Sequence, residues 1–498
     1  MDNNLDDKSM LHSDLSLLEK LSEFSFESKM LCSQSYSSRL MDGSKVNLKL
    51  AYKENIMPWE IEIFTAYSVM YNNDVATKDI DSKTFSEIIT YIRNYWDNSW
   101  EELEKTGDYA DAFMMRATIQ QFPIQGVFLQ KLFRYNYFFN FINDNVDMKK
   151  VYLDKFGAEY GEFAMMAFIV FLLCSATTDN KISGLDKGKV LTKVFKNKTV
   201  FSLLCIDKEE YIANMQKMYK SNIVQLYYGL KAHYWWPFIG GETYIYIPSP
   251  YLVINAVTDS MLNRLTLGND ALRHTIGKEV IETYLYDIYK QVDTVTWISN
   301  EIDYKIGSSS RKTSDVLVGE NDYCTFYDTK SMVPSLKIRT LDKKEINEST
   351  EIYADAIIQI FKQIKNYNLG HFQLDKKYAE ENLFGVVVML ESIALSREKM
   401  YLKAFELYED TNGTLSAEEK DYIHSHIKLV SLSQIETLVL ENNSFLPSLL
   451  NQANTPSSWN DLNFESSYEC KGLIPIYEKY VMDIKSEFKE FVTSADIE

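Results

Sequence analysis

Three residues near the middle of the chain have types and spacing that suit metal-assisted hydrolysis. Asp328 and Lys330 end the run YCTFYDTK, and Asp315 lies in the run SDVLV just upstream. Because alternate residues of a strand share one face, we expect Asp328 and Lys330 to lie side by side. If the chain turns between Asn321 and Asp322, paired positions sum to 643, and Asp315 then lies opposite Asp328.

Two carboxylates directly opposite each other repel unless a proton or a cation neutralises them. Mg²⁺ is commonly held by one or two carboxylates, with water and phosphate oxygens in its remaining positions. The pair therefore predicts a Mg²⁺ site, with Mn²⁺ as the alternative metal. The Asp-x-Lys tripeptide alone is a weak indicator, because it recurs, for example, at Asp375-Lys376-Lys377. An ordinary salt-bridge pair on a sheet surface is the alternative interpretation of Asp328 and Lys330.

The flanking sequence predicts the elements that would hold this site. Residues 271–289 have the apolar spacing of an amphipathic helix, and β-branched and aromatic residues mark strands at 294–304, 314–318 and 323–330. Helical spacing returns over 351–367, and LFGVVVML at 383–390 is typical of a buried strand. The predicted order is α-β-β-β-α-β.

This order and these residues resemble the core of the PD-(D/E)xK nuclease superfamily, over roughly Asn269–Leu390 or a quarter of the chain. The resemblance implies an α+β fold with a restriction-endonuclease-like αβββαβ core at 269–395. A mainly helical N-terminal domain of unknown role, 1–268, would precede this core. An α/β extension of the core, 396–498, would follow it.

The resemblance also implies roles for individual residues. Asp315 resembles the motif aspartate of the family, Asp328 its second acid and Lys330 its lysine. Glu282, on the preceding helix, resembles the helical glutamate of the family. These four residues would be catalytic, and Asp315, Asp328 and Glu282 would hold the metal. Glu279, one turn earlier, competes for the role of Glu282, and either glutamate could instead be an ordinary exposed residue.

A second part of the resemblance lies on the later helix. Gln363 and Tyr367 match the QxxxY pattern of RecB-like members, and their spacing places them on one helix face. They would contact DNA or brace the site. An ordinary polar helix face is the alternative, because Gln359 lies one turn earlier. One departure from the family pattern is Ser314, which stands before Asp315 where proline is usual.

Charge restricts how nucleic acid could bind. The chain has 52 Lys+Arg against 71 Asp+Glu, a formal charge of −19, which argues against coating of nucleic acid by bulk electrostatics. Residues 305–344, however, hold eight basic and five acidic side chains, a local charge of +3. Within this stretch we expect Arg311 and Lys312 to bind substrate phosphates. The N-terminal domain would then offer a binding surface to protein partners or to a second copy of the chain.

Length and composition set the remaining limits. The chain has 498 residues, of which 46% are hydrophobic, enough for several domains with buried cores. Its polar, acidic start lacks the pattern of a secretory signal, and its five cysteines form no CxxC pair. The most apolar stretch, 163–176, is shorter than the roughly 18–20 residues that span a bilayer. We expect a buried helix there, and a cytoplasmic protein without a membrane partner.

The combined prediction is a Mg²⁺-dependent phosphodiesterase, foremost a DNA endonuclease of bacterial restriction or antiphage defence. One alternative is a catalytically silent nuclease-like fold that serves as a nucleic-acid-binding or complex-assembly subunit. Another is an RNA nuclease, because the active-site residues do not separate DNA from RNA.

Overall fold

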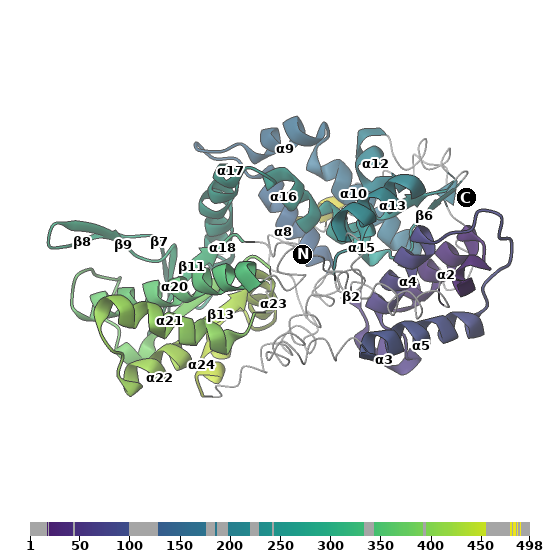
Figure 1. The fold of residues 1–498 in the computed structure, drawn as a ribbon. Helices are drawn as coiled ribbons and strands as arrows, with labels where there is room; N and C mark the ends of the chain where they lie inside the picture. The colour runs from purple at the N-terminus through teal and green to yellow at the C-terminus, as the bar shows by residue number, and fades with distance from the viewer. Residues whose placement is uncertain are drawn as a thin grey trace, which may run out of the picture.

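The computed structural model is a mixed α/β structure, mainly helical before residue 269 and built on a five-stranded sheet after it (Figure 1). Apart from single positions near both ends, it describes residues 19–42, 45–98, 128–175, 185–186, 198–219, 229–241, 244–332, 343–391 and 395–454. All structural statements below concern these residues.

The first half of the chain packs helices around a small sheet. The helices are α2 (Phe26–Arg39), α3 (Leu48–Glu54), α4 (Pro58–Met70), α5 (Ser82–Asn98), α8 (Phe128–Asn140), α9 (Met148–Phe156), α10 (Tyr160–Ser175), α12 (Lys198–Leu204), α13 (Lys208–Tyr219), η3 (Ala232–Tyr234), α15 (Tyr251–Val257) and α16 (Asp259–Thr266). The four-stranded sheet has the order β3 (Leu185–Asp186), β6 (Tyr244–Tyr246), β5 (Phe238–Gly240), β4 (Cys205–Asp207), and a separate short pair joins β1 (Met41–Asp42) to β2 (Lys45–Val46).

The second half contains the larger sheet, of order β13-β12-β11-β10-β7. Its strands are β7 (Val295–Asn300), β10 (Val316–Glu320), β11 (Tyr323–Lys330), β12 (Leu383–Met389) and β13 (Ile427–Ser431), and a separate hairpin joins β8 (Asp303–Ile306) to β9 (Ser309–Lys312). The helices are α17 (Asp270–Thr275), the π-helical turn η4 (Ile276–Ile281), α18 (Glu282–Tyr289), α20 (Lys343–Asn368), η5 (Glu380–Asn382), α21 (Arg397–Asn412), α22 (Ala417–His426), α23 (Leu432–Asn442) and α24 (Leu446–Asn454).

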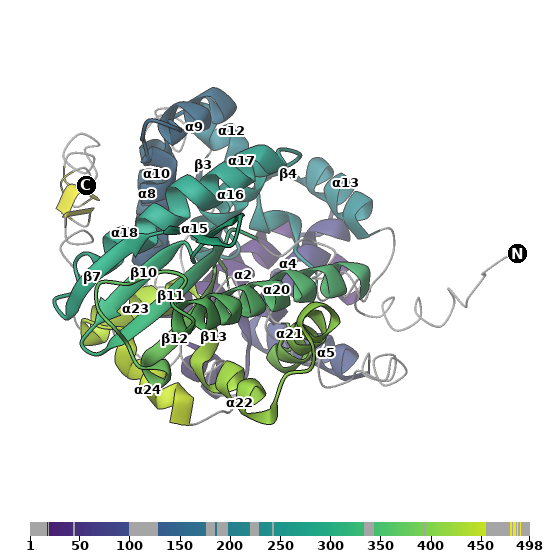
Figure 2. The ribbon, with the colours of Figure 1, turned by 90° about the vertical axis from the view of Figure 1, so that its left-hand side faces the viewer.

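Helices cover both faces of this sheet, and Figure 2 shows α20 lying across one of them. The buried strand β12 shows why both faces need cover, because its side chains alternate between two apolar clusters. Val386 and Val388 join the cluster that contains α18 and the N-terminal helices. Val387 and Met389 join the cluster that contains α20 and α21. One core therefore runs from the N-terminal helices onto one face of the sheet.

Most elements expected from the sequence are present. The stretch 163–176 lies almost wholly within the buried helix α10, and β11 covers the same residues as the predicted strand. The predicted strand 294–304 is wrong in one respect, because it divides into β7 and the start of β8, which belong to different sheets. The β8–β9 hairpin was not predicted, because SSSRK has no apolar alternation to mark a strand. Among the described helices, none is long and apolar enough to cross a membrane.

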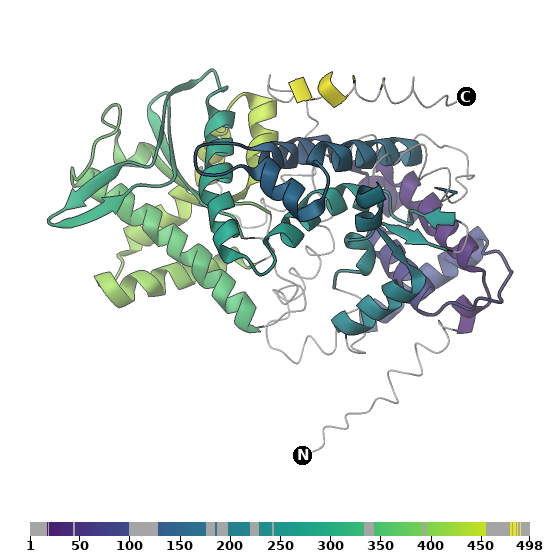
Figure 3. The same ribbon diagram turned by 90° about the horizontal axis from the view of Figure 1, so that it is seen from above.

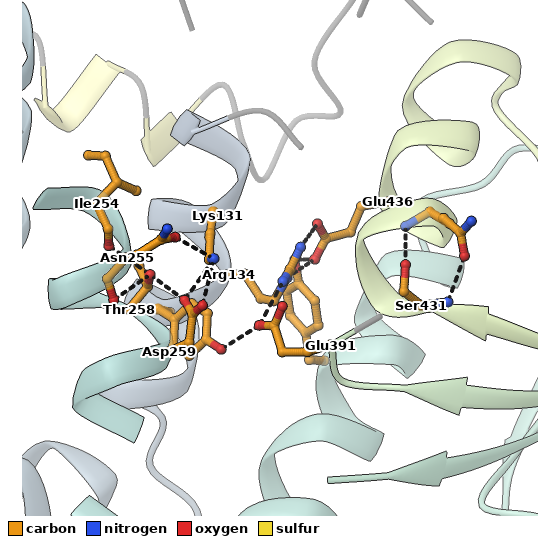
Figure 4. Close-up of polar contacts among 12 residues, drawn as sticks. Lys131, Arg134, Ile254, Asn255, Thr258, Asp259, Glu391, Ser431 and Glu436 are labelled. Carbon is orange, nitrogen blue, oxygen red and sulfur yellow. Dashed lines mark hydrogen bonds and ion pairs between the residues drawn. The ribbon is translucent and has the colours of Figure 1, made fainter. Parts of the chain in front are cut away.

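A buried polar network links helix α8 to the sheet region (Figure 4). The Arg134 guanidinium donates through Nε and Nη2 to the Glu436 carboxylate on α23, at 2.6 and 2.8 Å. Its Nη1 lies 3.7 Å from Oε1 of Glu391, which follows β12. On the same helix, Lys131 Nζ lies 2.8 Å from the carboxylate of Asp259. The side chains of Arg134 and Glu436 are only 3% and 0% exposed. Each buried charge is therefore stabilised by the opposite charge of the other residue.

We expect Arg134→Met to destabilise the chain by about 3–5 kcal/mol, because it leaves the Glu436 carboxylate buried without its cation. The midpoint of urea unfolding measures this change. The matched control is Lys20→Met, which breaks an exposed ion pair with Glu87 and should cost less than about 1 kcal/mol. Equal shifts for the two variants would contradict the stabilising role of the network.

Candidate active site

The hairpin of β10 and β11 sets the geometry of the site. Its register pairs Val316 with Tyr327 and Glu320 with Tyr323, so paired positions sum to 643 and the sequence-based register is confirmed. The two-residue turn has Asn321 in the left-handed region, at φ 52°, a conformation that asparagine tolerates better than most residues. This register places Asp315, just before β10, opposite Asp328 near the end of β11.

Asp315, Asp328 and Lys330 come together as predicted. Oδ2 of Asp315 accepts hydrogen bonds from the backbone N–H and the hydroxyl of Thr329, at 2.7 and 3.0 Å. Lys330 Nζ donates to Oδ1 of Asp328 at 2.9 Å. The register leaves the two carboxyl groups close enough for the charge of Asp328 to act on Asp315. Asp315 thus accepts two hydrogen bonds from Thr329 and Asp328 accepts one from Lys330, and the two acids still face one another.

Burial and mutual repulsion raise the pKa values of the two acids and so favour their protonated forms. Burial, followed by the charge of Asp328, raises the pKa of Asp315 to about 7. Burial also raises the pKa of Asp328, although Lys330 opposes this shift. For Lys330, burial alone would lower the pKa, but the Asp328 carboxylate outweighs it and the pKa rises. Lys330 is therefore a cation, and the two aspartates carry less than their full negative charge.

The helix that packs beside the hairpin distinguishes the two candidate glutamates. Burial and the charge of Asp315 raise the pKa of Glu282 to about 9, which places its carboxyl group in the field of the site. Glu279 instead accepts hydrogen bonds from Asn145 and Asn143, which lower its pKa. Glu279 lies within the π-helical turn η4, which ends at Ile281, just before Glu282 begins α18. Such turns widen a helix and change the direction of the residues that follow.

A glycine lets this helix approach the end of β11. A Cβ atom built on Gly277 would lie 3.0 Å from Oγ and 3.2 Å from Cβ of Ser331, the residue after Lys330. These distances are shorter than ordinary van der Waals contacts, so a larger residue at 277 would push the helix away. Gly277 therefore helps to bring Glu282 within range of Asp315.

A further acid, Glu301, was not identified from the sequence. It follows β7, and the register that pairs Asn300 with Val316 places it opposite Asp315. Three neighbouring strands therefore each carry an acid at the same edge of the sheet. The charge of Glu301 contributes to the raised pKa of Glu282, and its carboxylate forms an ion pair with Lys312. The sequence does not single out Glu301, because it predicts one strand over 294–304, whereas β7 ends just before Glu301.

The QxxxY residues lie on α20, which covers the face of the sheet next to the site. The Ser314 hydroxyl donates to Oε1 of Gln363, so Gln363 braces the residue next to Asp315. The Tyr367 hydroxyl accepts from the backbone N–H of Tyr378 at 2.8 Å and so holds the loop after α20. Asp355, which precedes Gln363 on α20 and was not predicted as a site residue, contributes to the raised pKa of Lys330.

The predicted phosphate-binding residues Arg311 and Lys312 lie on β9. Both are exposed, and the pKa of Lys312 is raised by Glu301 first and, in part, by the charge of Glu282 in the site. Lys337 and Arg339, which belong to the basic stretch 305–344, lie outside the described residues.

The residues present fit a divalent cation. Within the described part of the chain, no group of three or more His, Cys, Asp or Glu side chains is arranged as a ready-made metal cage. Mg²⁺ does not need one, because one or two carboxylates with water and substrate oxygens suffice. Asp315 and Asp328 supply two carboxyl groups that face each other across the hairpin, and their raised pKa values mark a place where a cation would replace a proton.

Comparisons of the chain with models of known protein families, with curated proteins and with solved structures gave no match. The chemistry of the site therefore rests on its own residues.

We expect Mg²⁺ or Mn²⁺ to raise the melting temperature of the wild-type chain, because the ion binds the native carboxyl pair and not the unfolded chain. The shift should disappear in Asp315→Asn and shrink in Glu282→Gln. The matched control is Glu279→Gln, on the same helix but bonded to Asn143 and Asn145, which should keep the full shift. An unchanged shift in Asp315→Asn would rule out this pair as the metal site.

The same measurement should depend on pH. Without metal, the raised pKa of Asp315 means that the folded chain binds a proton that the unfolded chain releases, so stability falls as pH rises through about 7. A cation competes with that proton, so the metal-induced shift should be larger near pH 8 than near pH 6. Scanning calorimetry at both pH values tests this, and a shift independent of pH would contradict it.

Proposed function

We propose that this chain is a Mg²⁺-dependent phosphodiesterase, and foremost an endonuclease that cuts DNA. The observation that carries the proposal is the β10–β11 register that sets Asp315 opposite Asp328, with the Lys330 ammonium 2.9 Å from Asp328. A sheet surface gains no stability from two facing buried acids, whereas a phosphate-cleaving site needs such a pair. The resemblance to the PD-(D/E)xK nucleases is the second support.

In this proposal each side chain has a separate task. Asp315 and Asp328 would hold the cation, with Glu282 in its inner or outer shell. The bound cation would stabilise negative charge on the oxygens of the scissile phosphate and lower the pKa of a water molecule. Lys330 would orient the attacking water and stabilise the negative charge that develops on the phosphoryl oxygens. By the family resemblance, the products would carry a 5′-phosphate and a 3′-hydroxyl.

A silent nuclease-like subunit would need fewer of these features. In such a subunit nothing preserves the costly juxtaposition of two acids and a lysine, yet here all three positions are filled and lie at the same end of the hairpin. The raised pKa of Glu282 adds a third acid in the same field. These features favour an active enzyme. A role in bacterial restriction or antiphage defence is the setting that we propose for it.

We expect Lys330→Ala and Asp328→Ala to lower the cleavage rate by about 100-fold or more, because each removes charge that acts on the transition state. Supercoiled plasmid, linear duplex, single-stranded DNA and RNA are incubated with each protein in Mg²⁺, Mn²⁺ or EDTA. Lys377→Ala, in the same Asp-x-Lys spacing but exposed on the loop after α20, is the matched control and should cut like the wild type. Equal cleavage by Lys330→Ala and Lys377→Ala would refute the assignment.

A further inference from the structure

The β8–β9 hairpin is an arm that extends from the acid-bearing edge of the sheet. Figures 1 and 3 both show it reaching away from the rest of the molecule. At its base, the backbone N–H of Thr313 donates to the carbonyl of Ile302 at 3.1 Å, and the Thr313 hydroxyl accepts from the N–H of Ile302 at 2.8 Å. The arm thus continues directly from Glu301 on one side and Asp315 on the other. A ligand that contacts the base of the arm therefore lies beside those acids.

Tyr304 and Ile306, on one face of β8, pack against the apolar cluster that contains α20, while β9 is exposed. Tyr304 is buried against the ring of Phe372, at a centroid distance of 4.8 Å, and its hydroxyl accepts from Asn366 of α20 at 3.0 Å. All four residues of β9 are exposed. Gly307 forms the tip at φ 59°, which permits a tight two-residue turn. A ribbon held through one face of β8 and bare along β9 has the form of a contact element and not of a core element.

The charge on the arm opposes that of the chain. Asp303 lies opposite Lys312 in the ladder, and Lys312 also pairs with Glu301, so the charge of Lys312 is offset at the root. Arg311 lies in the next pair, opposite Tyr304, and Lys305 lies one pair further out; both are exposed, in a chain whose net charge is −19. Tyr304 pairs with Arg311 and Lys305 with Ser310, so Lys305 and Arg311 point to opposite faces of the ribbon. The arm therefore carries one exposed basic side chain on each face.

We propose that this arm enters the major groove of double-stranded DNA and holds the duplex across the acids; the inference rests on the proposed function. Four residues of strand reach about 13 Å at roughly 3.3 Å per residue. The major groove of B-DNA is about 12 Å wide and 8.5 Å deep and admits a two-stranded ribbon. Lys305 and Arg311 would each face one phosphate wall, and the serines between them would donate to phosphate oxygens. The deep, narrow major groove of duplex RNA excludes such a ribbon.

The test measures binding by the full chain with Lys330→Ala, so that the nucleic acid stays intact. Labelled DNA duplex, RNA duplex and single-stranded DNA of one sequence are titrated by fluorescence anisotropy over a range of salt concentrations. The arm variant adds Lys305→Ala and Arg311→Ala. The matched control adds Lys49→Ala and Lys53→Ala, two exposed lysines on α3 that lie far from the arm in Figure 1. Equal melting temperatures of the two variants show that both are folded.

We expect the arm variant, but not the control, to bind duplex DNA more weakly and to lose about 2 from the slope of log K against log salt, one for each phosphate contact removed. Binding to single-stranded DNA should change little, and RNA duplex should bind weakly throughout. Equal duplex affinities of arm and control variants would overturn the arm inference, as would an equal loss on single strands. If wild-type protein cuts DNA in that case, the proposed function stands. If it neither binds nor cuts any nucleic acid, the proposed function itself fails.

Discussion

The repulsion between Asp315 and Asp328 is the constraint around which this half of the chain is organised. Two unit charges about 4 Å apart repel by roughly 4 kcal/mol at an effective dielectric constant of about 20. The Lys330 ammonium offsets the charge of Asp328, whereas Asp315 has only the hydrogen bonds from Thr329, worth about 1.5–3 kcal/mol each. Burial and the charge of Asp328 raise the pKa of Asp315 to about 7, so near neutral pH a proton and a cation compete for this carboxyl group.

An arrangement with this cost persists only where the surrounding structure leaves no easier alternative. The turn at Asn321 fixes the register of β10 and β11, and a slip by one residue would turn both acids to the other face. The opposite face cannot accommodate the two acids, because it packs into the apolar cluster that includes the N-terminal helices. Arg134 and Glu436 connect those helices to α23, next to β13. The strain at the sheet edge is thus held in place by packing far from it.

Local signals explain which parts of the site could be predicted from sequence. The register was predictable because a two-residue turn and period-two alternation leave one solution for Asp315, Asp328 and Lys330. The choice between Glu279 and Glu282 was not, because η4 departs from the α-helical period on which sequence patterns depend. Glu301 and the arm were missed together, since an exposed ribbon has no buried face and leaves no apolar alternation to read.

The missed elements bear on the substrate more than the predicted ones do. Carboxylates and a lysine can act on any phosphodiester, and nothing in Asp315, Asp328 or Lys330 distinguishes one nucleic acid from another. Selection must come from whatever holds the strand against them. Here β7 and β10 continue past Glu301 and Asp315 into the arm, so the strands that present the acids also carry the basic ribbon. Because the two are one continuous piece of backbone, the fit of the arm to a groove would decide which phosphates reach the acids.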